Sequence, residues 1–72
     1  MTDRKLLEEK IKQKGVKKGF LAEAIGVSRG TFSAQLRGRT EFKASQIKTL
    51  CELLDIEDGE TMTSIFFASS GA

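Results

Sequence analysis

The chain of 72 residues contains no histidine and only one cysteine, Cys51. The chain therefore lacks the cysteine and histidine residues that a zinc site, an internal disulfide or histidine-based catalysis requires. The sequence also has no phosphate-cradling glycine loop and no paired nucleophile and base. We expect no enzymatic activity, no metal and no cofactor. Cys51 falls within an apolar helical pattern, which predicts a buried small hydrophobe rather than a reactive thiol.

Long apolar segments are also missing. No stretch approaches the roughly 20 apolar residues of a membrane span, and residues 1–14 are too charged for a signal peptide. We therefore expect a cytoplasmic protein that uses neither a membrane nor a small-molecule substrate. A chain this short allows one domain with a small core, since it buries only about 60% of the surface that its unfolded form exposes.

The net charge of +2 conceals a division between the two halves of the chain. Residues 1–39 contain ten Lys and Arg against four Asp and Glu, whereas residues 40–72 contain two against six. Clustered positive charge is typical of a phosphate-binding face, because each neutralised phosphate releases counterions. For the lysines at positions 10, 12 and 14, a solvated helical surface is the simpler interpretation.

Capping residues and apolar spacing predict helices in the first part of the chain. Thr2 or Asp3 is expected to cap the first helix, which Gly15 ends. A second helix is expected from about Lys18 to Ile25. Its N-terminus is poorly capped and contains a glycine, so packing rather than propensity should hold it. The side chains expected to pack are Phe20, Leu21, Ala22 and Ile25.

The second part of the chain is expected to add one or two more helices after a third. Ser28 should cap a helix over Arg29–Arg37 that Gly38 closes, and Ser45 should cap a fourth helix. Phe42 is expected to plug the core from the loop between them. The apolar segment at residues 62–67 allows docking on the core, a short strand or pairing with another chain, and docking is favoured.

Residues 18–37 carry the pattern of two short helices joined by a tight turn. Ala22 is small where the helices approach, Gly26 can adopt a positive φ at the corner, and Val27 follows as an apolar anchor. The pattern predicts a helix-turn-helix, most often a DNA-reading module. We expect an all-α fold, a single small bundle of four to five helices over residues 1–68, with a flexible tail at 69–72.

Three segments resemble the Cro/repressor-type (XRE-like) helix-turn-helix family over about residues 5–67: VKKGFLAEAIGVSRGTFSAQLRGRTEF, SQIKTLCELLDI and IFFA. The pairing of GRTEF with IFFA is similar to small regulators of temperate phages in Gram-positive bacteria. Some of these are antirepressors that act on a lysogeny repressor. The resemblance implies a lambda-repressor-like bundle, a place near the nucleoid of a bacterial host cell, and a third helix that enters the major groove.

The resemblance also implies roles for individual residues. Arg29, Gly30 and Ala34 occupy the main base-reading positions, with Ser28 and Thr31 beside them. Lys18 replaces the usual backbone-contacting glutamine, and Arg37 and Arg39 would approach phosphates. The complete set expected to bind DNA or a partner is Lys17, Lys18, Ser28, Arg29, Gly30, Thr31, Ser33, Ala34, Arg37 and Arg39.

Helical geometry indicates that the reading face is bare. If Phe32 and Leu36 point inward, Gly30 and Ala34 lie near the outward face, and neither can form the bidentate bonds that distinguish bases. Arg29 is the strong candidate for base reading, with a phosphate contact or a surface ion pair as its alternatives.

Two classes of ligand fit this face, a nucleic acid and a protein. One is double-stranded operator DNA, which a homodimer would bind with useful affinity. The other is a cognate phage repressor, whose helix could approach the small-residue ridge of Gly30 and Ala34 while arginines pair with acidic residues. Either reading makes the chain a phage-type transcriptional regulator of a genetic switch. Operator DNA binding is the function we expect, and repressor binding is the alternative.

Overall fold

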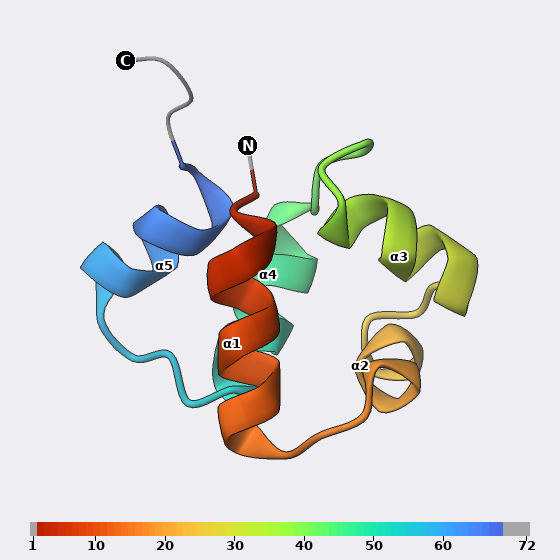
Figure 1. The fold of residues 1–72 in the computed structure, drawn as a ribbon, viewed down its shortest axis with the longest axis horizontal. Helices are drawn as coiled ribbons and strands as arrows, with labels where there is room; N and C mark the ends of the chain where they lie inside the picture. Colours follow the sequence, from red (N-terminus) through yellow and green to blue (C-terminus); the bar gives the residue numbers. More distant parts are fainter. Residues whose placement is uncertain (1, 69–72) are drawn as a thin grey trace.

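The computed structural model describes residues 2–68, and this part of the chain is helical with no strand (Figure 1). The helices are α1 (Arg4–Lys14), α2 (Lys18–Ala24), α3 (Arg29–Leu36), α4 (Ala44–Leu53) and α5 (Gly59–Phe66). The predicted all-α bundle is confirmed. Helices α2 and α3 end one residue earlier than expected, with Ile25 and Arg37 as their C-caps. The expected tail at 69–72 lies outside the described residues.

The start of α1 is tied to α5. Of the two predicted caps, Asp3 holds the helix start, because its Oδ1 accepts the N–H of Leu6 at 3.1 Å. The N–H of Asp3 donates to the carbonyl oxygen of Ile65 at 2.6 Å. At the other end, Gly15 adopts a φ of 74° and stops the helix as predicted. The bond between Asp3 and Ile65 joins the two ends of the described chain.

The predicted cap of α4 is wrong. Lys43, not Ser45, stands at the N-cap position, and its N–H donates to the side-chain Oε1 of Gln46 at 3.0 Å. Ser45 lies within the first turn, where its carbonyl oxygen accepts a bond from the Thr49 hydroxyl at 3.1 Å. The helix therefore begins two residues before the start that a Ser45 cap implies, and the Gln46 side chain bonds back to the N–H of the N-cap residue, as in one half of a capping box.

The core draws on all five helices and on the loop that precedes α4. Phe42 is buried from this loop as predicted, with its ring edge-on to Phe32 at 6.0 Å and to Phe66 at 5.6 Å between centroids. The docking prediction for the final segment is confirmed at Ile65 and Phe66, whereas Phe67 is 55% exposed. The other buried apolar residues are Leu7, Ile11, Leu21, Ala22, Leu36, Ile47, Leu50, Leu54 and Ile56.

The arrangement separates two ends of the molecule. Helices α2 and α3 pack on each other on one side of α1, and α5 packs against α1 on the opposite side (Figure 1). None of the helices in residues 2–68 is both long enough and apolar enough to cross a membrane. The pair α2–α3 therefore stands at the edge of the bundle, where its outer surface is free of the other helices.

Candidate nucleic-acid interface

The turn between α2 and α3 is the one predicted from sequence. Gly26 adopts a φ of 77°, its N–H donates to Glu23 O at 3.0 Å, and the N–H of Val27 donates to Ala22 O at 3.0 Å. This pair of bonds is a Schellman motif, which requires a left-handed residue at the corner. A Cβ on Gly26 would meet no atom within 4 Å. The turn therefore needs glycine for its φ and not for space.

Helix α3 is fixed at both ends. Ser28 Oγ accepts the N–H of Thr31 at 3.1 Å and donates to the Thr31 hydroxyl at 3.0 Å. At the far end, Gly38 has a φ of 81° and the N–H of Arg39 donates to Ala34 O at 2.9 Å. These bonds define where the helix begins and ends. They also commit the Ser28 hydroxyl to the fold.

The outer surface of α3 carries few long side chains. Gly30 and Thr31 are exposed, whereas Ser33 and Ala34 are half-buried, which makes Ala34 less outward than its predicted position. Phe32, Gln35 and Leu36 face the core. Added to Gly30, a Cβ would meet only the Ser28 hydroxyl at 3.9 Å. The face is thus open but offers little direct hydrogen bonding to base edges.

A cationic cleft lies beside α3. Its volume is about 300 Å³, and its charged lining residues are Arg4, Lys18, Arg29 and Arg37. Phe32, Ser33 and Leu36 form the rest of the wall. Three of the five predicted cations thus meet here, together with Arg4, which sequence reasoning missed. Arg4 stands in the first turn of α1, and only the packing of α1 against α2 and α3 brings it to this site.

Glu8 binds two of the four cations. Its Oε1 lies 2.6 Å from Lys18 Nζ, and its Oε2 lies 3.0 Å from Arg4 Nε. The bonds from Lys18 and then Arg4 lower the pKa of the Glu8 carboxyl, so it is ionised at neutral pH. Within residues 2–68, neither Arg29 nor Arg37 forms an ion pair with a carboxylate.

Arg29 folds back on α2. A Cβ built on Gly19 would lie 3.0 Å from its Nε and 3.1 Å from its Nη2, so the guanidinium rests against the glycine backbone. An alanine at position 19 would need only a small shift of this flexible side chain, so the contact locates the Arg29 head but does not explain a glycine that weakens the helix propensity of α2 by about 1 kcal/mol. The head of Arg29 therefore lies between α2 and α3, at the rim of the cleft.

Phe20 departs from its predicted place. It was expected to pack within α2, but its side chain is 53% exposed. It borders a shallow hollow of about 610 Å³ on the outer surface of the helix-turn-helix. The other lining residues are Lys17, Gly19, Ala22, Glu23, Val27, Ser28 and Arg29. An aromatic side chain that is exposed at such a place is a feature that the apolar pattern alone did not show.

The predicted set is therefore distributed over neighbouring parts of one surface. Lys18, Arg29, Ser33 and Arg37 line the cleft, and Lys17, Ser28 and Arg29 line the hollow. Gly30, Thr31 and Ala34 lie on α3 and line neither of these two depressions. Arg39 is exposed in the loop after α3. Arg29 is the residue that the two depressions share.

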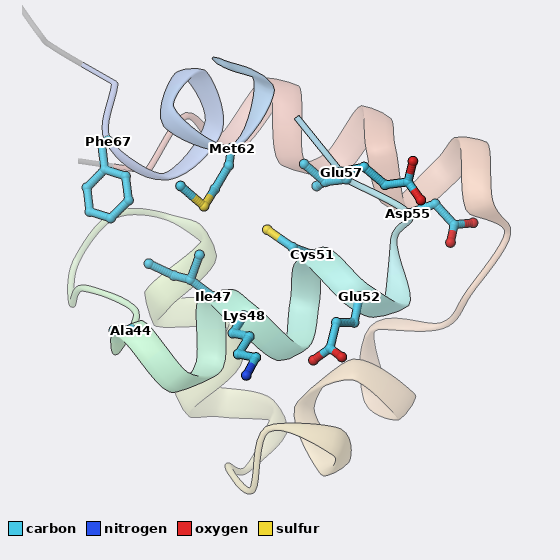
Figure 2. A pocket seen from close by; sticks show the side chains of 10 residues that line it. Ala44, Ile47, Lys48, Cys51, Glu52, Asp55, Glu57, Met62 and Phe67 are labelled. Atoms are coloured by element: carbon cyan, nitrogen blue, oxygen red, sulfur yellow. The ribbon is translucent and has the colours of Figure 1, made fainter. Parts of the chain in front are cut away.

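A third depression lies away from this surface. It is an apolar groove of about 560 Å³ between α4 and α5, with Cys51 and Met62 facing it and Phe67 at one end (Figure 2). Glu52, Asp55 and Glu57 gather toward the other end. None of its lining residues belongs to α2 or α3. The groove is thus separate from the helix-turn-helix surface.

The sequence was compared with protein families, curated proteins and solved structures. Residues 6–65 match the model of the Cro/C1-type HTH DNA-binding domain. No curated protein and no solved structure matches the chain significantly. The family match spans α1 to the last turns of α5 and so includes the turn at Gly26, both ends of α3 and the core beneath them. The chain belongs to the Cro/C1-type helix-turn-helix DNA-binding domain family.

Proposed function

We propose that this protein is a phage-type transcriptional regulator of a genetic switch, and that it binds double-stranded operator DNA through α3 and the cationic cleft. The observation that carries the proposal is the position of the cleft: four cationic side chains surround it beside α3. Phosphate oxygens form strong charge-assisted bonds with such side chains, and these bonds position a recognition helix on the duplex.

The bare surface of α3 limits how much base sequence the protein reads directly. Gly30 and Ala34 contribute no bidentate bonds, and the Ser28 hydroxyl is committed to the helix cap. Arg29 is the long side chain at the start of the helix, and a bidentate bond to guanine is worth about 1–3 kcal/mol of discrimination. Affinity should therefore depend mainly on phosphate contacts, and it should fall steeply with salt.

Useful operator affinity calls for two copies. Successive major grooves on one face of DNA are about 34 Å apart, and each chain contributes one recognition helix. The longest dimension of the described structure is 32 Å. A homodimer would place a second α3 in the next groove. We propose a symmetric dimer on the operator for this reason.

A second function has its own supporting observation, which is the exposed ring of Phe20. Aromatic residues are enriched at the centres of protein interfaces, where they fill apolar hollows, and Arg29 at the rim could pair with an acidic partner residue. Under this alternative, the protein is an antirepressor. Its helix-turn-helix face would bind the cognate lysogeny repressor and block or alter the DNA binding of that repressor.

Two single substitutions separate these functions. Arg37→Ala removes a cation from the cleft and leaves the hollow intact, whereas Phe20→Ser removes the ring and leaves every cation. The measurements are gel shift with the DNA that flanks the gene, and co-elution with any repressor-like protein that a neighbouring gene encodes. DNA binding that Arg37→Ala weakens and Phe20→Ser spares supports the regulator. Repressor binding without DNA binding, lost in Phe20→Ser, supports the antirepressor and contradicts direct operator recognition.

A further inference from the structure

Glu8 occupies a position that the phosphate-binding function does not require. It lies in the second turn of α1, and its two carboxylate oxygens contact Lys18 and Arg4, one each. Both contacts are short, at 2.6 Å and 3.0 Å. All three side chains keep a substantial part of their surface exposed to solvent, so an anion from outside can reach the same cations.

The two cations that Glu8 binds are half of those in the cleft. Arg4 and Lys18 line it together with Arg29 and Arg37, which have no carboxylate partner among residues 2–68. A carboxylate and a phosphate present the same kind of charged oxygen acceptor to lysine and arginine. Glu8 thus satisfies the same donors that a DNA phosphate would need.

We propose that Glu8 is an internal competitor of DNA phosphate that lowers the affinity of the cleft for the duplex. This inference rests on the proposed DNA-binding function. When Glu8 keeps its partners, the DNA gains only Arg29 and Arg37 at this site and meets an extra negative charge. When a phosphate takes Lys18 or Arg4, the corresponding bond to Glu8 is lost. In both cases the free energy gained when DNA binds is smaller than it would be without Glu8.

The alternative role for Glu8 is to orient the same cations for DNA. The two roles predict opposite changes when the charge is removed and the shape is kept, as in Glu8→Gln. Competition predicts tighter binding, because Lys18 and Arg4 become available and the local negative charge is gone. Orientation predicts weaker binding.

Glu9 provides a matched control. It is the next residue of α1, is exposed and has no ion pair in the described part of the chain. Glu9→Gln changes the net charge by the same amount without freeing a cleft cation. The two variants and the wild type would be titrated into a fluorescein-labelled DNA duplex over a series of salt concentrations, with binding followed by fluorescence anisotropy.

Each exposed ion pair of Glu8 is worth up to about 1 kcal/mol, so Glu8→Gln, which spares an arriving phosphate the loss of one of the two pairs, should tighten binding about five-fold at low salt. The slope of log K against log salt should steepen by about 0.9, as one further phosphate is neutralised. Glu9→Gln should leave the slope unchanged. In the background of Lys18→Ala, the gain from Glu8→Gln should shrink.

Three results would overturn the proposal. If wild type binds DNA and Glu8→Gln behaves like Glu9→Gln, Glu8 does not compete, and the DNA-binding function still stands. If Glu8→Gln binds more weakly at unchanged thermal stability, Glu8 orients the cations instead. If neither the wild type nor any variant binds DNA at low salt, the proposed DNA-binding function fails together with this inference.

Discussion

Gln35 of α3 donates from Nε2 to Gln46 Oε1 of α4 at 2.9 Å, and the same oxygen accepts the N–H of Lys43 at 3.0 Å. One side-chain oxygen of Gln46 therefore bonds both to the backbone at the start of α4 and to the side chain of Gln35 in α3. Gln35 is only 4% exposed, so its amide has no ready access to water as a substitute. The bond links the proposed recognition helix to the second half of the bundle.

Gln46→Ala should destabilise the protein by about 1–3 kcal/mol, because it leaves the buried Nε2 of Gln35 without its nearest acceptor and removes the acceptor for the N–H of Lys43. Gln35→Met is the matched test, since it removes the buried amide and keeps the length of the side chain. Its effect should be much smaller. Urea unfolding followed by circular dichroism measures both, and equal losses would contradict the assigned role of Gln46.

Gly26→Ala should destabilise the fold by about 1–2 kcal/mol, the penalty for a left-handed backbone at a residue with a Cβ. The loss arises from φ alone, because a Cβ there would clash with nothing. Gly30→Ala places the same methyl group within helix α3, where it should stabilise by up to about 1 kcal/mol. Thermal unfolding of the two variants compares them directly. Similar shifts of the same sign would refute this account of the turn.

Asp58 should make stability depend on pH in the acid range. It caps α5, and bonds from the hydroxyl and the N–H of Thr61 lower the pKa of its carboxyl below the usual 3.8. Its contribution is therefore present above the unfolded-state pKa and is lost as the pH falls through the lower folded-state value. Asp58→Asn keeps a capping side chain without the titration. Urea midpoints measured from neutral to strongly acid pH should fall less steeply for this variant.

Cys51 should react slowly with thiol reagents. Burial raises the pKa of its thiol above the usual 9.0, so little thiolate forms near neutral pH. The side chain is half-buried and borders the α4–α5 groove rather than lying fully within the core (Figure 2). Its rate with Ellman's reagent should be below that of free cysteine and should rise with pH. A rate equal to that of free cysteine at pH 8 would contradict this environment.

Local features of the fold could be predicted from sequence. The turn at Gly26, the cap at Ser28 and the closing glycine at position 38 each depend on residues close together in the chain, and all three are confirmed. The capping of α4 was missed because the helix begins at Ala44, two residues before the start that a Ser45 cap implies, and the Gln46 side chain bonds back to the N–H of Lys43. The sequence offers several side chains that could bond at the start of a helix, and only the structure shows which of them does.

Features that depend on tertiary packing could not be predicted. Helix α2 has only seven residues, and its apolar positions do not show which of them turns outward, so Phe20 was placed wrongly. Arg4 and Lys18 are separated by 14 positions in the sequence, and only the packing of α1 places them at one cleft around Glu8. The difference in charge between the two halves of the chain indicated a basic surface, but it did not show which basic residues meet at the cleft.

The measurement that tests the central claim most directly is the salt dependence of duplex DNA binding by the wild type and by Arg29→Ala/Arg37→Ala. We expect binding that weakens steeply with salt, and a slope smaller by up to about 1.8 in the double variant, since each lost phosphate contact contributes about 0.9. Lys43→Ala/Lys48→Ala removes the same charge from the acidic half and should change the slope much less. Absence of DNA binding at low salt, or equal effects of the two double variants, would contradict the claim.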